Sequence, residues 1–355
     1  MKRISAVLLV ITIAMSLLVG CNDKGGEQKY DTKTRQVSLV YFNTVSIISS
    51  YGDTTDAEMD AYAAAADELL GYYHHLFDIY FEYAGISNLR TVNKNAGKAP
   101  VKVDAELIDF LEKCKELFTL TNGKTNVMMG AVLRIWHNYR EDGMDDPNAA
   151  KVPSAEELTA AAEHTDIDSL IIDREASTVY ISDPEASIDV GAIGKGYATE
   201  RLYERLCEMG ADSMALNIGG NLRTIGVMPS GDNWRTGITN PDRTNPNFAA
   251  RISFGETSCV TSGDYERYYV AGGEKYHHII DPVTLFPADY FSSITVITPN
   301  SAMADALSTA LFCLSLEDGQ SMLASIRAAG ITVEALWIDG EGKITATDGI
   351  VRLPD

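Results

Sequence analysis

The sequence predicts an α+β protein in which helices pack on mixed, largely antiparallel sheets. Three observations predict this class. The spacing of apolar residues switches repeatedly between a period of 2, typical of strands, and a period of 3.6, typical of helices. Helices do not alternate strictly with strands, and several strand pairs are separated by short turns, as in hairpins. The 355 residues are 45% hydrophobic and 22% charged, so the chain can bury a substantial core.

Each element follows from a local pattern. Residues 37–52 are rich in Val, Ile and Tyr and predict two strands or one bent strand. Residues 55–77 place apolar side chains on one helical face, with Thr55 or Asp56 as the N-cap. Residues 104–123 predict a second helix with a glycine stop, and a capping-box pattern at Ser154 starts a third.

The second half of the chain alternates hairpins with strand-to-helix units. Residues 169–182 predict a hairpin, and residues 187–210 predict a strand, a glycine-rich turn and a helix. Residues 213–227 predict two strands around a Gly-Gly turn. Residues 291–315 predict a strand followed by a helix capped by Ser301, and residues 331–349 predict a closing hairpin.

The chain is strongly acidic, with 29 Lys and Arg against 50 Asp and Glu and a formal net charge of −21. This balance excludes nucleic acid as a partner, because phosphate backbones attract surfaces rich in Lys and Arg. A site for an anionic ligand would therefore need a local source of positive charge, such as a helix N-terminus or a bound metal.

The first residues resemble an export signal. A basic start is followed by an apolar run that ends in "LVGC", which resembles a bacterial lipobox. We expect residues 1–20 to be a lipoprotein signal peptide, Cys21 to carry the lipid and residues 21–36 to form a tether. The domain would then span residues 37–355, anchored to the cell membrane on its extracytoplasmic face. The alternative is an uncleaved membrane anchor.

A glycine-rich turn, "DVGAIGKGYATE", spans residues 189–200. Its glycines come just before a predicted helix, where backbone N–H groups can approach a phosphate, and Lys195 adds a positive charge. The spacing fits neither a Walker A loop nor a dinucleotide-binding fingerprint. Turns of this kind are common, so an ordinary structural turn is the alternative.

Asp305 and Thr309 lie four residues apart in "ADALST" and therefore stack on one face of the predicted helix. A carboxylate and a hydroxyl one turn apart can both point oxygen atoms at a hard cation such as Mg²⁺, which takes few protein carboxylates. The alternative is a surface Asp beside a Thr that bonds back to its own helix.

Two of the six histidines are adjacent in "YHHIIDPVTLFP", residues 276–287. A strand that ends in a solvated loop would explain them, but His277 or His278 could also be a base beside a bound substrate. Neighbouring residues of a strand face opposite ways, so only one of them can point into a site. The preceding "TSGDYERYY" offers a further anion-holding turn at residues 261–263.

Together, "DVGAIGKGY", "NIGGN", "TSGDYER", "HHIIDP" and "ADALST" resemble, in order, the flavin transferases of the ApbE type (FAD:protein FMN transferases). The resemblance runs from Tyr41 to Phe312. It implies an ApbE-like fold and a Mg²⁺-dependent reaction with FAD as substrate. FAD is split at its pyrophosphate, FMN passes to a Thr or Ser hydroxyl of an acceptor protein, and AMP leaves. The implied acceptors are subunits of redox complexes or extracytoplasmic flavoproteins.

The resemblance also implies roles for individual residues. His278 would act as a base that takes the proton of the acceptor hydroxyl, or would carry FMN transiently. Mg²⁺ would be held by the side chains of Asp305 and Thr309 and the backbone carbonyl of Ala192. FAD would contact Phe42, Met128, Asp189, Lys195 and Ile280.

The chain departs from the family pattern in two places. Family members usually read D-P-x-T-G-x-P, but "DPVTLFP" has Leu285 in place of the glycine. If that position needs a positive φ, leucine is disfavoured there. Lys124, Thr125 and Asn126 replace a stretch that usually carries an acid.

Three other readings remain open. An FAD pyrophosphatase would use water as the nucleophile and release FMN and AMP. A non-catalytic FAD-binding lipoprotein would need no base, and therefore no residue in the role of His278. A lipid-anchored solute-binding protein would need two alternating α/β lobes, against which the predicted hairpins argue.

Overall fold

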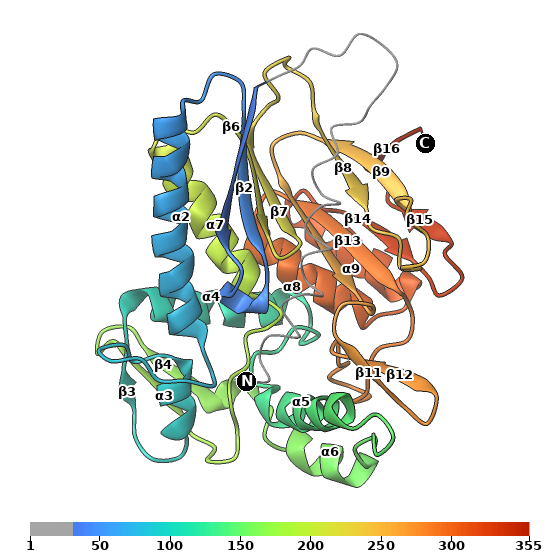
Figure 1. The fold of residues 1–355 in the computed structure, drawn as a ribbon. Coiled ribbons are helices and arrows are strands. Elements are labelled where there is room, and N and C mark those ends of the chain that lie inside the picture. Colours follow the sequence, from blue (N-terminus) through green and yellow to red (C-terminus); the bar gives the residue numbers. More distant parts are fainter. Residues whose placement is uncertain (1–30, 355) are drawn as a thin grey trace.

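The computed structural model describes residues 31–354 and confirms the predicted α+β class (Figure 1). Its centre is a sheet of eight strands in which every neighbouring pair is antiparallel. In spatial order the strands are β1 (Thr32–Ser38), β2 (Ser46–Tyr51), β6 (Ser213–Ile218), β7 (Asn221–Gly226), β10 (Ser258–Gly263), β13 (Ser293–Thr298), β14 (Glu334–Ile338) and β15 (Ile344–Ala346).

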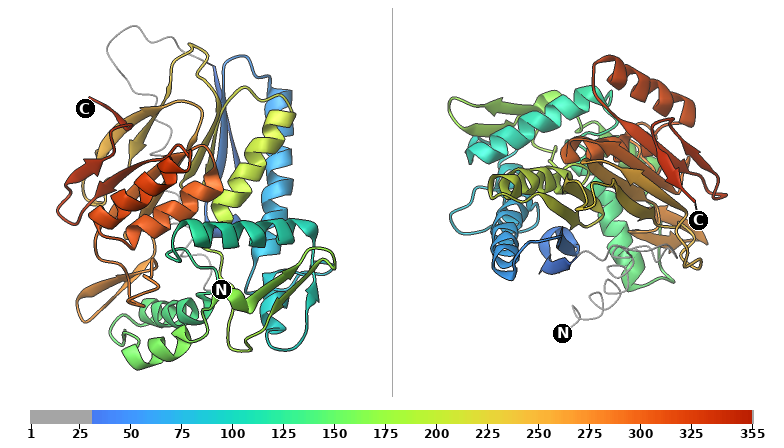
Figure 2. Two further views of the ribbon diagram at one scale, coloured as in Figure 1. Left: turned by 180° about the vertical axis from the view of Figure 1, so that it is seen from behind. Right: turned by 90° about the horizontal axis from the view of Figure 1, so that it is seen from above.

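Helices cover one face of this sheet, as the view from behind shows (Figure 2). They are α2 (Asp56–Phe77), α7 (Gly194–Glu208), α8 (Ser301–Phe312) and α9 (Leu316–Ala328). A second sheet of three strands packs on the central sheet through a separate apolar cluster. Its strands are, in order, β16 (Val351–Leu353), β9 (Ala250–Phe254) and β8 (Trp234–Ile238).

Alternation along β14 shows how one strand serves both layers. Ala335 and Trp337 belong to the core cluster formed with α8 and α9, whereas Leu336 and Ile338 belong to the cluster formed with β8 and β9. Successive side chains of a strand point to opposite faces, so an uninterrupted apolar run is required where both faces are covered. The run "ALWI" meets this requirement.

The remaining elements lie at one end of the central sheet (Figure 1). They are η2 (Tyr41–Asn43), α3 (Leu89–Lys94), α4 (Ala105–Leu120), α5 (Gly130–Asp145), α6 (Ala155–Ala162), η3 (Ile167–Ser169), the small sheet β3 (Val101–Lys102), β5 (Thr178–Ile181) and β4 (Leu170–Asp173), and the hairpin β11 (Tyr268–Ala271) with β12 (Glu274–His277). This end carries the predicted histidine and the segment around residue 128.

The predicted helix starts are confirmed by their caps. The Thr55 side chain accepts from the amide of Glu58, whose carboxylate accepts from the Thr55 amide in return. Asp104 caps α4 and Ser154 caps α6. Each cap satisfies amide groups that have no partner within the helix.

The predicted hairpins are also confirmed. Strands β4 and β5, β6 and β7, and β14 and β15 form antiparallel pairs. Gly219 and Gly220 join β6 to β7 with φ of 58° and 89°, a left-handed turn that glycine adopts without steric cost.

Four features differ from expectation. β1 begins at Thr32, inside the segment predicted as tether, so the domain starts before residue 37. Thr34 and Arg35 make its register specific, because they bond to Ser49 and Asp60. Residues 187–190 form no strand and make a single bridge between Ser187 and Met129.

The other two differences are the cap of α8 and a set of elements that had no prediction. Asn300, not Ser301, caps α8, because its side chain accepts from the Met303 amide at 3.0 Å. Helices α5 and α9 and strands β8 and β9 were not predicted as elements. The proposed signal peptide and Cys21 lie outside the described residues. Within 31–354 there is no helix whose length and apolar character would let it cross a membrane.

Candidate functional site

The glycine-rich turn and the Asp305 helix meet. The Gly194 amide donates to Val190 O at 2.8 Å, which closes the turn and starts α7. The next residues then face α8: the Gly196 amide donates to Asp305 Oδ2 at 2.8 Å, and Lys195 Nζ lies 3.5 Å from Asp305 Oδ1. A carboxylate that is 3% exposed therefore sits against one helix N-terminus and one ammonium group.

The predicted metal ligands supply only oxygen. Asp305 and Thr309 stack on α8, and Ala192 lies in the turn just before α7. Across residues 31–354 the Thr309 hydroxyl has no hydrogen bond, so the expected alternative of a Thr bonded to its own helix does not occur. A carboxylate, a hydroxyl and a carbonyl are hard donors of the kind Mg²⁺ selects. Among the three predicted ligands only Asp305 supplies a carboxylate. In agreement, the described residues contain no cluster of three or more His, Cys, Asp or Glu that could hold a metal ion.

Asp189 and Met128 come from neighbouring segments. The Asp189 amide donates to Val127 O at 2.8 Å, and the Gly130 amide donates to Ser187 O at 3.1 Å. Met128, which lies between Val127 and Gly130 in the chain, is fully buried. The Asp189 carboxylate accepts from the Gly191 amide at 2.9 Å, and burial raises its pKa.

The two adjacent histidines have different surroundings. His277 ends β12 and is buried; its Nε2 donates to Ala288 O at 2.8 Å and its Nδ1 accepts from the Ile279 amide. His278 follows the strand, and its buried Nδ1 has no hydrogen-bond partner within the described part of the chain. His277 is therefore a structural residue with both nitrogens occupied, whereas His278 has a buried ring nitrogen without a hydrogen-bond partner among residues 31–354.

Positive charges surround His278. Burial lowers its pKa well below the usual value, and the charges of Arg267, Lys195 and Arg140 lower it further. The lowered pKa favours the neutral form of the imidazole.

Sequence reasoning missed Arg140 and Arg267 in this role. Both also act on Asp189, where their charges oppose the effect of burial on its pKa. Arg267 lies in the "TSGDYER" stretch, but only residues 261–263 of that region were given an anion-binding role. Arg140 had no local signal; it contacts His137, whose ring centroid lies 5.6 Å from that of Tyr80.

Ile280 and Phe42 are held from different directions. Ile280 is buried, pairs with Pro287 and receives the Cys313 thiol at 3.8 Å on its carbonyl. Phe42 lies in η2 with φ of 55°, and its amide is 3.4 Å from His74 Nδ1. No hydrogen bond or ion pair among residues 31–354 links Phe42 to the other predicted site residues.

Leu285 adopts the left-handed conformation that a glycine would favour, with φ of 64°. Its amide donates to Asp281 O at 2.8 Å, and its carbonyl accepts from Trp136 Nε1 at 2.8 Å. The turn after His278 therefore keeps the geometry of a glycine turn despite the substitution. The Leu285 side chain packs against the buried apolar cluster that contains Trp136.

Lys124 has a partner of its own at this turn. Its ammonium group lies 2.8 Å from Asp281 Oδ1, and both side chains are largely buried. The segment after α4, which lacks the usual acid, thus supplies a cation that holds the turn after His278.

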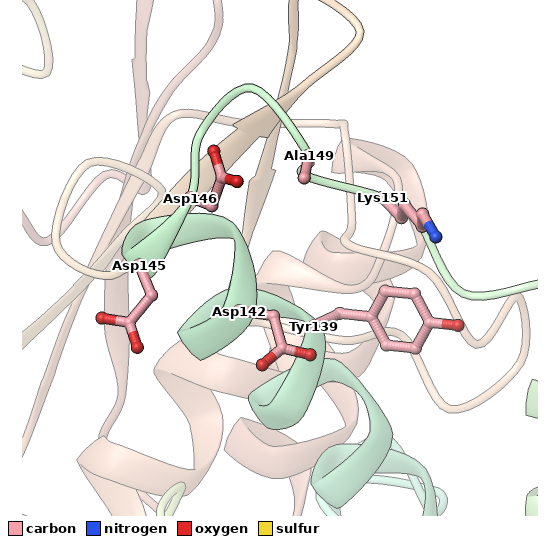
Figure 3. Close-up of a pocket in the computed structure, with 6 residues that line it drawn as sticks. All are labelled: Tyr139, Asp142, Asp145, Asp146, Ala149 and Lys151. Carbon is pink, nitrogen blue, oxygen red and sulfur yellow. The ribbon is translucent and has the colours of Figure 1, made fainter.

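A separate pocket lies at the C-terminal end of α5 and holds none of the predicted residues (Figure 3). Figure 3 shows the carboxylates of its lining residues pointing in different directions. The lining residues are Tyr139, Asp142, Asp145, Asp146, Ala149 and Lys151. Because the carboxylates do not converge, this pocket is not part of the candidate site.

Comparison with known proteins agrees with the motifs. The model described as "ApbE family" matches residues 41–333. The FAD:protein FMN transferase of Treponema pallidum is 30% identical, over 98% of this chain and 95% of the relative. The enzyme of the same name from Klebsiella pneumoniae is 29% identical, over 67% and 71%.

Solved structures share the fold. The ApbE protein of Thermotoga maritima superposes with a TM-score of 0.75 at 26% identity, covering 90% of this chain and 97% of that one. The flavin transferase ApbE of Vibrio cholerae gives 0.72 at 24% identity, covering 90% and 98%, which shows the fold alone. From its sequence match and its fold, the chain belongs to the ApbE family.

Proposed function

We propose that this protein is a Mg²⁺-dependent FAD:protein FMN transferase. In the proposed reaction an acceptor Thr or Ser oxygen forms a bond to the FMN phosphorus of FAD. The pyrophosphate bridge breaks, AMP leaves, and the hydroxyl proton passes to a base. The observation that carries the proposal is the neutral imidazole of His278, with a buried Nδ1 that has no partner among residues 31–354.

His278 would take the proton of the acceptor hydroxyl. A Thr hydroxyl is a poor nucleophile at neutral pH and needs a positioned base to react. Because its pKa is lowered, His278 stays unprotonated and available. His277 cannot share this role, since both of its nitrogens are bonded to backbone groups.

Lys195 and the start of α7 would hold the phosphates. Amide groups at a helix N-terminus favour anions, and Lys195 adds a positive charge at the same point. Arg140 and Arg267 would extend this positive field toward His278. A chain of net charge −21 can in this way bind an anionic substrate at one local site.

The metal would be held by Asp305, Thr309 and the carbonyl of Ala192. These hard oxygen donors fit Mg²⁺, and Asp305 is fixed by the Gly196 amide. When bound, the ion would neutralise charge on the pyrophosphate. Phe42, Met128, Asp189 and Ile280 would contact the flavin nucleotide.

The proposal extends to location and partner. The printed names of the relatives support a protein acceptor, because they describe FMN transfer to protein. The lipobox-like "LVGC" ending at Cys21 supports a lipid anchor and an extracytoplasmic position. We therefore take the acceptor to be a redox subunit or flavoprotein exposed on that side of the membrane.

The test combines the full-length chain in detergent with FAD, Mg²⁺ and an acceptor domain carrying a Thr flavinylation motif. The acceptor's intact mass is measured for wild type, His278→Ala and Asp305→Ala. His164→Ala is the matched control, because this partly exposed histidine pairs with Asp183 and has no hydrogen bond or ion pair with a predicted site residue among residues 31–354.

We expect wild type and His164→Ala to add the mass of FMN to the acceptor. His278→Ala should slow transfer by about 10²–10⁴-fold, the usual contribution of a general base. Release of FMN and AMP without acceptor labelling would favour a pyrophosphatase. Intact FAD in every reaction would refute both enzymatic functions and leave a flavin-binding protein.

A further inference from the structure

Helices α7 and α8 touch through two polar contacts one helical turn apart. In the first, the Gly196 amide donates to Asp305 Oδ2 at 2.8 Å. In the second, the Ser301 amide donates to Glu200 Oε2 at 2.6 Å. Residues 196 and 200 share one face of α7, and residues 301 and 305 share one face of α8. The two helices therefore run antiparallel along this contact, which we call the α7–α8 ladder.

The ladder fixes how close the helices lie. A Cβ atom on Gly196 would be 2.3 Å from Ser301 O and 2.6 Å from Asp305 Cβ. The backbone of α7 is thus in direct contact with α8 at the Asp305 carboxylate. Glu200 acts at the other end of the contact, where it satisfies an amide at the start of α8 and so sets the position of α8 along α7.

Arg223 ties the ladder to the central sheet. Its Nε lies 3.4 Å from Glu200 Oε2, and its Nη1 donates to Thr224 O at 2.7 Å. Its guanidinium carbon lies 3.4 Å above the Tyr203 ring. Glu200 and Arg223 are 9% and 4% exposed.

Burying this pair has a desolvation cost that apolar side chains of similar size would avoid. The pair is therefore weak evidence of added stability, but Glu200 does fix one contact at the start of α8. The only predicted ligands that α8 carries are Asp305 and Thr309, which lie one and two turns after Ser301.

We propose that Glu200 is a positioning residue for the metal site: through Ser301 it holds α8 in the register that brings Asp305 to the start of α7. The inference rests on the proposed function, because it takes Asp305 as a metal ligand. It adds a residue that touches neither metal nor substrate.

The experiment measures binding of Mn²⁺ alone, without FAD or acceptor, from the free-ion electron paramagnetic resonance signal of the full-length chain. Glu200→Met removes the ladder contact, and Glu200→Gln keeps an amide oxygen that can accept from Ser301. Glu204→Met is the matched control, because Glu204 lies one turn further along α7 and pairs with Arg201 at the surface. Val179→Ala, in the small sheet, controls for general loss of stability.

We expect Glu200→Met to weaken Mn²⁺ binding at least about tenfold, the usual effect of removing an outer-shell partner. Glu200→Gln should stay within about threefold of wild type, because the hydrogen bond to Ser301 survives. Glu204→Met and Val179→Ala should bind as wild type does.

Each of the following results would overturn the inference. Equal weakening in Glu200→Met and Val179→Ala would mean that stability alone controls the site. Wild-type affinity in a folded Glu200→Met, or the same large loss in Glu200→Gln as in Glu200→Met, would remove the positioning role. Absence of Mn²⁺ binding by wild type would refute a preformed metal site, while the acceptor-mass experiment would still decide the transferase.

Discussion

At the scale of single residues, the protonation of His278 predicts how activity depends on pH. Its pKa is lowered in the folded protein, first by burial and then by neighbouring positive charges. A base works in its unprotonated form, so kcat/KM for FAD should stay flat on the alkaline side of 6.5 and fall only at lower pH. A pH profile of kcat/KM tests this; a fall that begins above pH 6.5 would contradict it.

Replacing Arg267 tests the cause of the lowered pKa. Of the neighbouring charges, that of Arg267 lowers the pKa of His278 most, so Arg267→Gln should raise this pKa. The acid limb of kcat/KM should therefore move to higher pH, whatever the change in KM. Arg235→Gln removes an exposed arginine of β8 and serves as the control. If the acid limb of kcat/KM lies at the same pH in wild type, Arg267→Gln and Arg235→Gln, Arg267 does not set the pKa of His278.

Leu285 allows a direct measurement of backbone strain. With φ of 64°, both leucine and alanine are strained by about 1 kcal/mol there, but glycine is not. In urea titrations, the free energy of unfolding of Leu285→Gly should therefore be about 1 kcal/mol higher than that of Leu285→Ala. At exposed Val283 the order should reverse by about 0.4–1 kcal/mol, because glycine has more freedom in the unfolded chain. The same order at both positions would exclude strain at Leu285.

At the scale of elements, the Lys124–Asp281 pair joins the segment after α4 to the turn after β12. Lys124→Met leaves a buried carboxylate that keeps only the Val283 amide, so the free energy of unfolding should fall by about 3 kcal/mol. Adding Asp281→Asn removes the unpaired charge and should recover part of that loss. Urea unfolding of both variants and of the double mutant measures the coupling.

A surface pair on α4 is the matched control. Lys113 and Glu116 pair at an exposed position, so Lys113→Met should change the free energy of unfolding by less than about 0.5 kcal/mol. If Lys113→Met and Lys124→Met lower the free energy of unfolding equally, burial of the Lys124–Asp281 pair has no consequence for stability.

Elements with a complete local signal were predictable, and the others were not. Thr55 with Glu58 fixes the start of α2, and Gly219–Gly220 fixes a hairpin, because each signal lies within a few residues. Helix α5 starts after Met129, which makes no side-chain cap, so its start has no local mark. Ile188 and Val190 alternate as in a strand, but the segment finds a pairing partner at one position only.

At the scale of the whole molecule, the site combines residues from distant parts of the chain. Spacing alone could pair Asp305 with Thr309, because both lie on one helix. The contact of Asp305 with Lys195 crosses more than a hundred residues, and family resemblance, not periodicity, gave His278 its role. Arg140 and Glu200 were missed because only the fold brings them to the site or to the helix that carries it.

The membrane anchor is the prediction that concerns the chain as a whole. If residues 1–20 are removed and Cys21 is lipidated, expression of the full-length chain should yield a mature protein that starts at Cys21 and carries a diacylglyceryl group. Cys21→Ser should keep residues 1–20 and carry no lipid, since the modified sulfur is gone. Intact mass spectrometry of both proteins from a bacterial host tests this.

The outcome also separates anchoring from catalysis. The first described strand, β1, starts at Thr32, and no predicted catalytic, FAD-contacting or metal-binding residue precedes Phe42. Acceptor labelling by Cys21→Ser in detergent should therefore match wild type within about twofold, about 0.4 kcal/mol. A wild-type product that retains residues 1–20 without lipid would support the uncleaved anchor instead. Loss of labelling in detergent would show that the anchor contributes to the reaction itself.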